Sequence, residues 1–466
     1  MSENFDVVVI GAGPAGYVAA IRAAQLKQKV AIVDKQWLGG VCLNVGCIPS
    51  KSLLRNAEIA HTLRERGKEF GFSMDNLKLD YGVAVKRSRQ NSDRLVKGIG
   101  FLMKKNNIPV FMGEAKFKSK DTVAVTDKNG KVTELKAKNI IVATGASAAS
   151  PAAWKIDGEK VVTYWEAILQ NKLPKSVVVI GSGAIGVEFS TIWNSYGVDV
   201  TIVEMLPRIV PLEDEEVSKE LEKEFKKRGI KAMTGHKVES VEATATGVKV
   251  VVSADGKQTT LEADQALVAI GFRPNSKGLG LEEIGVKVNE RGFVEIDEKM
   301  QTNIPGIWAI GDLTGKLMLA HVGSAMGIIC AENIAGAETV TLDYEMMPRA
   351  TYCQPQVASF GLTEAQAKER GYTVKIGRFP FQPNGKALGM GDYAGFVKLV
   401  IDEKYGEILG AHMIGPEVTE LLPELTLAHM MELTPHEIAR NVHAHPTLSE
   451  AIMEAAHAAE GSAIHI

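Results

Sequence analysis

The segment from Gly39 to Lys51 has the clearest capacity for chemistry, and it reads GGVCLNVGCIPSK. Cys42 and Cys47 enclose four residues, which is wider than the C-x-x-C spacing of a thioredoxin-like motif. No His or further Cys stands near enough in the sequence to complete a zinc site. The alternative is that both are buried structural cysteines, but the glycines that flank them and the following Pro49 make this interpretation less favoured. Because the chain has only four cysteines in 466 residues, we expect any bridge here to be catalytic.

Two neighbouring thiols can exchange an electron pair with a dithiol substrate. A mixed disulfide forms on one sulfur while the other leaves as a thiolate. A cysteine with its ordinary pKa of about 8.5 is mostly protonated at neutral pH, so the leaving sulfur needs a positive charge nearby. Lys51 follows Cys47 by one helical turn if the segment is helical. The alternative is that Lys51 is an ordinary surface lysine.

Two further segments share the G-x-G-x-x-G spacing that binds the pyrophosphate of a dinucleotide. Each lies between an expected parallel strand and a helix, and a second strand then ends in an acid 23 residues after the first glycine. Glycines let the backbone approach a pyrophosphate closely, and the helix N-terminus supplies N–H groups. One copy alone could be a tight turn, but two in the same register indicate two dinucleotide sites. The two sets are Gly11, Gly13, Gly16 with Asp34, and Gly181, Gly183, Gly186 with Glu204.

Two dinucleotides on one chain suggest a flavin that exchanges electrons with a nicotinamide. The Glu204 carboxylate would accept a hydrogen bond from the 2′-hydroxyl of NAD and repel a 2′-phosphate. Arg208 lies nearby and ranks second to Glu204 as a determinant. We therefore expect FAD at the first site and NAD at the second.

The segment HAHPTLSE, residues 443–450, combines imidazoles with a carboxylate near the end of the chain. An anion such as Glu450 would raise the pKa of a histidine and narrow its gap of about two units from a thiol. A competing explanation is a capping box, in which Thr447 and Glu450 open the following helix. His445 is followed by Pro446, and this peptide bond could be cis. His443 is the alternative base.

These motifs resemble those of the pyridine nucleotide–disulfide oxidoreductases over essentially the whole chain, and GGVCLNVGCIPSK is highly specific for the members that carry a redox disulfide. The resemblance implies that Cys42 is the outer sulfur that meets the substrate and that Cys47 is the inner sulfur beside the flavin. It also implies that His445 is the base and that Glu450 holds its imidazole. In this family the base of one chain faces the outer sulfur of the other.

The resemblance implies further cofactor contacts. Lys51 would lie near the reactive nitrogen of the flavin and pair with Glu188. A second flavin motif ends at Asp312, which would accept from the ribityl chain, and a helix N-terminus follows at the pyrimidine edge. Asp34 stands where Glu is commoner in the family, which could alter flavin affinity modestly. The remaining implied contacts are Thr144, Gly145, Met318, Leu319, Ala320 and His321 for FAD, and Gly271 for NAD.

The implied fold is α/β, with two Rossmann-like dinucleotide-binding domains of the glutathione reductase type and a C-terminal α+β dimerisation domain. The expected domains are the first part of the FAD domain (1–148), the NAD domain (149–271), the second part of the FAD domain (272–346) and the interface domain (347–466). The apolar segment 421–431 is a candidate interface helix, or alternatively a core helix. The charged stretch 213–228 predicts a solvated helix. We expect Cys330 and Cys353 to be buried small hydrophobes.

The activity implied by the resemblance is oxidation of protein-bound dihydrolipoamide to lipoamide, with reduction of NAD⁺ to NADH. The implied partners are a second copy of the chain, lipoyl carrier domains, and the peripheral-subunit-binding domain of an E2-type subunit in 2-oxoacid dehydrogenase complexes. A glutathione reductase-like enzyme is the alternative, but Gly186 and Glu204 oppose its usual preference for NADP. A scaffolding subunit is the alternative from another class. No metal is expected.

Composition excludes other classes of protein. The 53 basic and 56 acidic residues give a net charge of −3 and are interspersed, so no basic patch predicts nucleic-acid binding. No apolar run of about 18 residues predicts a spanning helix, so no membrane association is expected. The first residues carry acids where a signal peptide would be positive, and we therefore expect a cytoplasmic protein.

Overall fold

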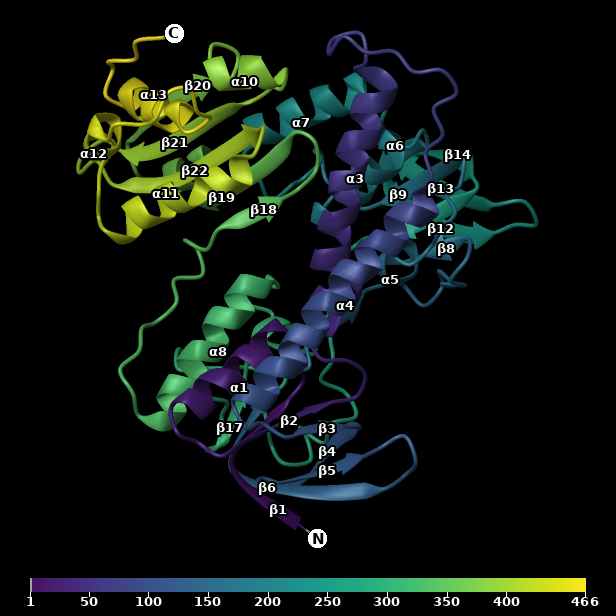
Figure 1. Cartoon of the computed structure of the whole chain (residues 1–466), viewed down its shortest axis with the longest axis vertical. Coiled ribbons are helices and arrows are strands. Elements are labelled where there is room, and N and C mark those ends of the chain that lie inside the picture. The colour runs from purple at the N-terminus through teal and green to yellow at the C-terminus, as the bar shows by residue number, and fades with distance from the viewer. Residues whose placement is uncertain (1) are drawn as a thin grey trace. The chain divides into compact units, whose positions relative to one another are not determined.

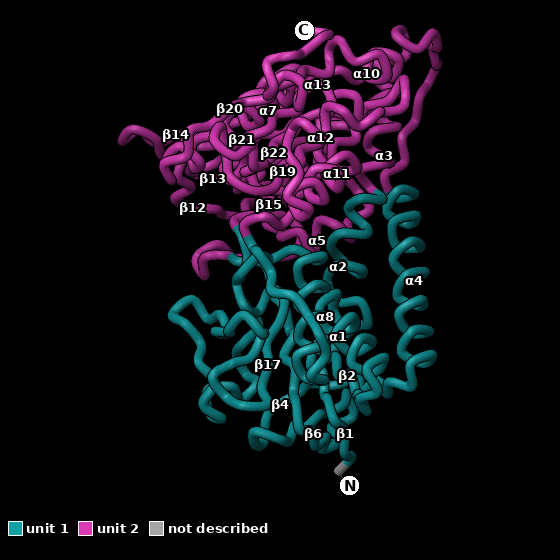
Figure 2. Tube along the Cα trace, turned by 90° about the vertical axis from the view of Figure 1, so that its left-hand side faces the viewer, with its two compact units in different colours: residues 1–52, 82–149, 271–344 teal, residues 53–81, 150–270, 345–466 magenta. Residues whose placement is uncertain are grey.

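The computed structural model describes residues 2–466. Their backbone divides into two compact units, each assembled from three stretches of the chain (Figure 2). Unit 1 comprises residues 1–52, 82–149 and 271–344, and unit 2 comprises residues 53–81, 150–270 and 345–466. Two long helices, α3 (Cys47–Glu65) and α4 (Tyr81–Lys105), contain residues of both units.

Unit 1 is built on a seven-stranded sheet in the order β3-β2-β1-β6-β5-β4, with β17 also paired to β6. The pairs β1–β2, β2–β3, β1–β6 and β6–β17 are parallel, and β4, β5 and β6 form an antiparallel meander. The strands are β1 (Ser2–Ile10), β2 (Val30–Asp34), β3 (Val110–Met112), β4 (Glu114–Ser119), β5 (Thr122–Thr126), β6 (Val132–Val142) and β17 (Ile307–Ala309).

The other elements of unit 1 cover this sheet or connect its strands. Helices α1 (Pro14–Gln25) and α8 (Ala320–Ala335) lie side by side (Figure 1). They can approach closely because Gly323 and Gly327 of α8 face Ala15 and Ala19 of α1 without a Cβ between them. The smaller elements are α2 (Gly40–Val45), η1 (Gly311–Thr314) and the pair β7 (Ala146–Ala148) and β16 (Phe272–Pro274).

Unit 2 contains a second parallel sheet, in the order β11-β10-β9-β15-β8. An antiparallel three-stranded sheet, β12-β13-β14, packs its apolar residues against it. These elements are β8 (Val161–Val162), α5 (Tyr164–Ala167), β9 (Ser176–Ile180), α6 (Ala184–Ser195), β10 (Asp199–Val203), α7 (Glu215–Lys227), β11 (Lys231–Met233), β12 (Lys237–Ala243), β13 (Val248–Ala254), β14 (Lys257–Ala263) and β15 (Gln265–Val268).

The C-terminal part of unit 2 is an antiparallel sheet in the order β18-β19-β22-β21-β20, whose strands share one apolar core with α11 and α13. Its elements are β18 (Arg349–Thr351), β19 (Gln356–Gly361), α9 (Glu364–Glu369), β20 (Val374–Pro380), α10 (Gly385–Met390), β21 (Phe396–Asp402), β22 (Ile408–Gly415), α11 (Val418–Met430), α12 (Pro435–Arg440) and α13 (Glu450–Ala459). The predicted fold class, with two Rossmann-like sheets and a C-terminal α+β part, is confirmed.

The helix predicted over residues 213–228 forms as α7, and its charged face is exposed as expected, with Lys219, Lys223 and Lys227 58–71% exposed. Only the start of the helix departs from the expected solvation. Lys398 lies on β21, between β22 and β20, with a side chain only 2% exposed, and its Nζ is 2.6 Å from Glu216, 2.8 Å from Glu364 and 3.3 Å from Asp214. The start of α7 is therefore buried against the C-terminal sheet. Across the described residues, no helix has the length and apolar character to cross a membrane.

Candidate active site

Both glycine-rich turns have the same geometry. A Cβ built on Gly16 would lie 1.8 Å from the carbonyl oxygen of Gly11, and one on Gly186 would lie 2.0 Å from that of Gly181. These glycines are required for the helix to pack on the turn. A Cβ on Gly13, by contrast, would have only an atom at 3.9 Å nearby.

The middle position of the second turn is open as well, since nothing lies within 4 Å of a Cβ built on Gly183. Gly13 and Gly183 are the residues just before helices α1 and α6. The open space therefore lies where helix N–H groups point, and it is a cradle of the kind that a pyrophosphate occupies.

The two acids that end the second strands hold these turns. Asp34 accepts hydrogen bonds from the N–H groups of Ala12 (2.7 Å), Gln36 (2.8 Å) and Trp37 (2.9 Å). Glu204 accepts from the N–H groups of Ser182 (2.9 Å) and Leu206 (2.9 Å), and also from the Ser182 hydroxyl at 2.7 Å.

Each acid thus joins the glycine turn to the loop after the second strand, beside the pyrophosphate cradle, where ribose recognition was predicted. The guanidinium of Arg208 donates to the carbonyl of Pro211 at 3.3 Å.

The two cysteines lie on consecutive helices of unit 1. Cys42 is in α2, and Cys47 is the first residue of α3, so the predicted one-turn spacing to Lys51 is confirmed. Between the cysteines, the buried Asn44 donates its side-chain N–H groups to the carbonyls of Leu38 (3.0 Å) and Gly40 (2.9 Å).

Arg89 of α4 donates to the backbone carbonyl of Asn44. This brace was not predicted from the sequence, because Arg89 is 45 residues from its partner. Asn44, a polar residue between the two cysteines, was the one signal in the sequence that could have indicated this contact.

The side chains of Cys42 and Cys47 form a hydrogen bond, and this bond raises the pKa of the Cys42 thiol well above its ordinary value. Burial adds to the effect, and the positive charge of Lys51 opposes it. Cys42 therefore retains its proton at neutral pH in this hydrogen-bonded pair. Burial also raises the pKa of Tyr17, in α1, with contributions from both cysteines, so Tyr17 lies near the pair.

The residues predicted to hold the rest of a flavin lie on unit 1. Thr144 donates its hydroxyl to the carbonyl of Asn275 at 2.9 Å, and the Asn275 amide returns a bond of 2.9 Å to Thr144. Gly145 and Gly271 both have positive φ, 68° and 116°. Helix α8 begins at Ala320, so the expected helix start within Met318–His321 is confirmed.

Asp312, in η1, is the most informative of these residues. Burial raises its pKa to about 6, and within residues 2–466 no donor satisfies its carboxylate. A buried acceptor that lacks a donor fits a ligand that brings hydroxyl groups, as the ribityl chain of FAD does. Together with the open cradle at Gly13, this residue makes unit 1 fit FAD.

His445 and Glu450 lie together on unit 2, at the start of α13. His445 Nδ1 is 2.9 Å from Glu450 Oε1, and the imidazole is 77% exposed while Glu450 is 20% exposed. The His445–Pro446 peptide bond is cis. Burial raises the pKa of Glu450, but hydrogen bonds from the Thr447 N–H and from His445 outweigh it, so the net shift is downward.

The predicted capping box is half formed. Glu450 Oε2 accepts from the Thr447 N–H at 2.8 Å, but the Thr447 hydroxyl donates to the carbonyl of Ala444 at 2.7 Å instead of capping the helix. The residue that precedes the helix is Ser449, because α13 begins at Glu450. Glu450 thus fixes both the loop and the imidazole.

The other predicted residues are divided between the two units. The cysteines and Lys51 belong to unit 1, while His445 and Glu188 belong to unit 2, so the pair of Lys51 with Glu188 stays a prediction. Glu188 is buried in α6 and accepts from the N–H of Tyr352 at 3.0 Å.

Three expectations about other parts of the chain can also be compared with the structure. Cys330 and Cys353 are fully buried, as expected. The apolar segment 421–431 forms most of α11, where Leu425 is buried and Met430 is 71% exposed. One face of α11 is thus a core face and the other is open to solvent. Among the described residues, no group of three or more His, Cys, Asp or Glu could hold a metal ion.

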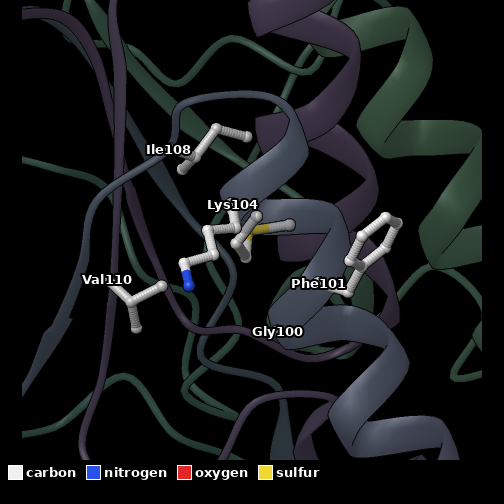
Figure 3. A pocket seen from close by; sticks show the side chains of 6 residues that line it. Gly100, Phe101, Lys104, Ile108 and Val110 are labelled. Carbon is white, nitrogen blue, oxygen red and sulfur yellow. The ribbon is translucent and has the colours of Figure 1, made fainter.

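A surface cavity of about 520 Å³ lies near the C-terminal end of α4. Its lining includes Phe101, Lys104, Ile108 and Val110, and the Lys104 side chain runs toward Val110 (Figure 3). None of its lining residues was predicted as a site residue.

Comparison with known proteins gives a consistent result. Residues 5–327 match the protein-family model "Pyridine nucleotide-disulphide oxidoreductase", and residues 347–456 match the dimerisation domain of the same family. The chain is 55% identical to the dihydrolipoyl dehydrogenase of Mycobacterium leprae over 99% of both chains. It is 51% identical to that of Corynebacterium glutamicum over the full length of both.

Among solved structures, LpdA from Mycobacterium tuberculosis superposes with a TM-score of 0.90 and 28% identity, over 97% of this chain and 99% of LpdA. The flavoprotein disulfide reductase RclA from Escherichia coli superposes with a TM-score of 0.87 and 25% identity, over 97% of this chain and 99% of RclA. With family models that together span most of its length, and with the paired cysteines and twin glycine turns in place, this chain belongs to the pyridine nucleotide–disulfide oxidoreductase family.

Proposed function

We propose that this protein oxidises the dihydrolipoyl group to lipoyl and reduces NAD⁺ to NADH, with FAD as its resident cofactor. The hydrogen-bonded pair Cys42–Cys47, one helical turn from Lys51, is the observation that carries the proposal. The relatives named dihydrolipoyl dehydrogenase favour this substrate over the disulfide of a glutathione reductase-like enzyme.

The residues proposed for each step follow from the chemistry of thiol exchange. In the oxidised protein, a substrate thiolate attacks Cys42 of the Cys42–Cys47 disulfide, so that a mixed disulfide forms and Cys47 leaves as a thiolate. The second substrate thiol then attacks its own mixed disulfide and releases the Cys42 thiol. The products are the cyclic substrate disulfide and two protein sulfurs in the reduced state.

His445 takes the proton from the first attacking thiol, returns it to Cys42 when that sulfur is released, and then takes the proton of the second thiol. Glu450 orients the imidazole through the 2.9 Å contact at Nδ1. Lys51 stabilises the negative charge on sulfur. A bound FAD would supply the two-electron relay between the two thiols and NAD⁺, with hydride transfer as its chemistry toward the nicotinamide. The cis His445–Pro446 bond is part of the loop that presents the imidazole.

The cofactor contacts are proposed on the same basis. For FAD they are Gly11, Gly13, Gly16, Asp34, Lys51, Thr144, Gly145, Asp312, Met318, Leu319, Ala320 and His321, and for NAD they are Gly181, Gly183, Gly186, Glu204 and Gly271, with Glu188 as the partner of Lys51. The division into domains at residues 148, 271 and 346 also stays a proposal.

The match of residues 347–456 to a dimerisation domain supports a homodimer, in which the base of one chain would serve the cysteines of the other. We further propose that the substrate is presented on lipoyl carrier domains and that an E2-type peripheral-subunit-binding domain docks the protein. Sedimentation of the pure protein tests the dimer, and comparison of a lipoylated domain with free dihydrolipoamide as substrate tests the carrier.

The decisive experiment replaces Cys47 with Ser. The variant is expected to keep its flavin and to oxidise NADH with an artificial one-electron acceptor, because that reaction bypasses the cysteines, while NAD⁺-dependent dihydrolipoamide oxidation is lost. Cys330→Ala, which removes a buried thiol in α8, is the matched control and should retain both reactions. Dihydrolipoamide oxidation that survives in Cys47→Ser would rule out the proposed route.

A further inference from the structure

His443 is the second histidine of the loop that carries the base, and its surroundings are different from those of His445. Its side chain is only 4% exposed, against 77% for His445. The ring lies between the loop and helix α11, with Nε2 2.9 Å from Oε1 of Glu424 and Nδ1 2.8 Å from the carbonyl oxygen of Asn441.

Both atoms that face the ring nitrogens are acceptors. A carbonyl oxygen has no proton to give, and a carboxylate at neutral pH has none either, so each nitrogen satisfies its partner only as an N–H donor. This arrangement favours the protonated form of the ring. The Glu424 hydrogen bond raises the pKa of His443, burial opposes it, and the Asn441 carbonyl and the charges of Glu424 and Glu450 add to the rise.

This protonation state argues against His443 as the alternative base, because an imidazolium has no lone pair to accept a proton. In His445, by contrast, Nδ1 faces Glu450 and the exposed ring leaves Nε2 on the solvent side. The two histidines are two residues apart and differ in their surroundings: the His443 ring is buried with both nitrogens facing acceptors, and the His445 ring is exposed.

The base loop is held at several points besides His443. At its far end, Asn384 at the start of α10 donates to the carbonyl of Thr447 at 3.0 Å, and Glu450 binds the Thr447 N–H. At its near end, Glu424 Oε1 of α11 is contacted by His443 at 2.9 Å and, at 3.5 Å, by the amide of Asn441. The inner face of α11 packs in the core of the C-terminal sheet. The imidazole of His445 is thus carried on a segment fixed at both ends.

Resting on the proposed function of His445, we propose that His443 and Glu424 are positioning residues for the base: their ion pair anchors the loop 441–447 to α11 and so fixes where the His445 imidazole is presented. Neither residue touches the reacting sulfurs in this scheme. They affect the reaction rate only through the orientation of the His445 imidazole. A displacement of the order of 1 Å at a catalytic group can reduce a rate by about a hundredfold.

Two substitutions at His443 separate the anchor from the local turn. His443→Asn can still donate to the Asn441 carbonyl but is too short to reach Glu424, whereas His443→Gln reaches Glu424 and gives up the local contact. We expect His443→Asn to lower kcat for dihydrolipoamide oxidation about tenfold, and His443→Gln to lower it about threefold or less. Glu424→Ala should match His443→Asn, and the double variant should be no worse than either single one.

Three controls in the full-length flavoprotein distinguish the possible explanations. NADH oxidation with an artificial acceptor, which needs no base, should be unchanged in all of these variants. His443→Asn should cause no additional loss in a His445→Gln background, because the base that it positions is gone. His436→Gln removes a 58% exposed histidine of α12 that lies 3.9 Å from Glu460, and it should have no effect.

The possible results decide the proposal. Normal dihydrolipoamide turnover in His443→Asn overturns it, as does an equal loss in the acceptor reaction, which would indicate general damage to the fold. A loss as large as that of His445→Gln would make His443 itself the base and would also overturn it. If instead the parent protein does not oxidise dihydrolipoamide, the proposed function has failed and not the anchor.

Discussion

An added methyl group should have different effects at two glycines of the NAD turn: at Gly183, the middle glycine, it should weaken NAD⁺ binding, and at Gly186, an outer glycine, it should destabilise the fold. A Cβ at residue 183 meets nothing within 4 Å, and the backbone there has an ordinary φ of −67°. Gly183→Ala should therefore fold normally, because the small loss of N-cap preference is offset by the reduced freedom of the unfolded chain. Its methyl group, however, occupies the space that a pyrophosphate must enter.

The magnitude follows from the cost of overpacking. Forcing extra atoms into a close-packed contact costs about 1–3 kcal/mol, which corresponds to roughly a 5- to 150-fold weaker affinity at about 1.4 kcal/mol per factor of ten. The KM for NAD⁺ should rise by that factor while the bound flavin is unaffected. Gly186→Ala instead places its Cβ 2.0 Å from the carbonyl oxygen of Gly181, so it should lower the thermal unfolding midpoint by several degrees or prevent folding.

Steady-state kinetics with varied NAD⁺ and thermal unfolding by circular dichroism measure the two effects. Gly13→Ala, the equivalent change in the FAD turn, provides an internal comparison and should weaken flavin retention instead of NAD⁺ affinity. An unchanged KM for NAD⁺ in Gly183→Ala would show that the open space beside residue 183 is not the pyrophosphate cradle, and the assignment of this turn would have to be abandoned.

Four further predictions concern other residues. His445→Gln should lower dihydrolipoamide turnover by orders of magnitude while flavin stays bound, and near-normal turnover would reject the assignment of the base. NAD⁺ should be strongly preferred over NADP⁺ because Glu204 repels a 2′-phosphate, which comparable kcat/KM values for the two would contradict. Lys398→Met should lower the free energy of unfolding by about 3–5 kcal/mol, since it leaves the buried Asp214 carboxylate without its cation, and urea unfolding measures this. Burial raises the pKa of Asp312 in the folded protein to about 6, above its unfolded value of about 3.8, so ionisation of this carboxyl lowers the stability of the flavin-free protein above pH 6 and has no effect below pH 4. Asp312→Asn should therefore stabilise the flavin-free protein by up to about 3 kcal/mol at pH 8 but not at pH 4. A gain of the same size at both pH values would contradict this explanation.

The features that could be predicted from the sequence are those written in short stretches of it. The glycine turns, the acids 23 residues later, the cysteine pair and the histidine before Pro446 each lie within one supersecondary unit. Local rules of strand, turn and helix therefore place them. The features that were missed join distant stretches: Arg89 contacts Asn44 across 45 residues, and Lys398 reaches Asp214 across 184.

The part of the α7 prediction that failed, the solvation of its first residues, has the same origin. An acidic start and a basic end are typical of a solvated helix, and the charge order was realised in the structure. The pattern could not show that Lys398 stands on a buried strand opposite those acids. The capping box at Thr447 was half right because the Thr447 hydroxyl donates to the carbonyl of Ala444 instead of capping the helix, which the motif alone could not show.

The buried lysine limits how this protein could be assembled from parts. The family recognises the segments 5–327 and 347–456 as separate modules, which invites exchange of the second module between relatives. Lys398 comes from one module, while Asp214 and Glu216 come from the other. Glu364, from the same module as Lys398, also contacts the lysine, and Glu216 is 42% exposed, so the buried Asp214 is the side chain that depends most on this contact. A chimaera that inherits a leucine or a threonine at position 398 would leave the Asp214 carboxylate buried without its cation, so an exchange of the two modules should keep this charge contact.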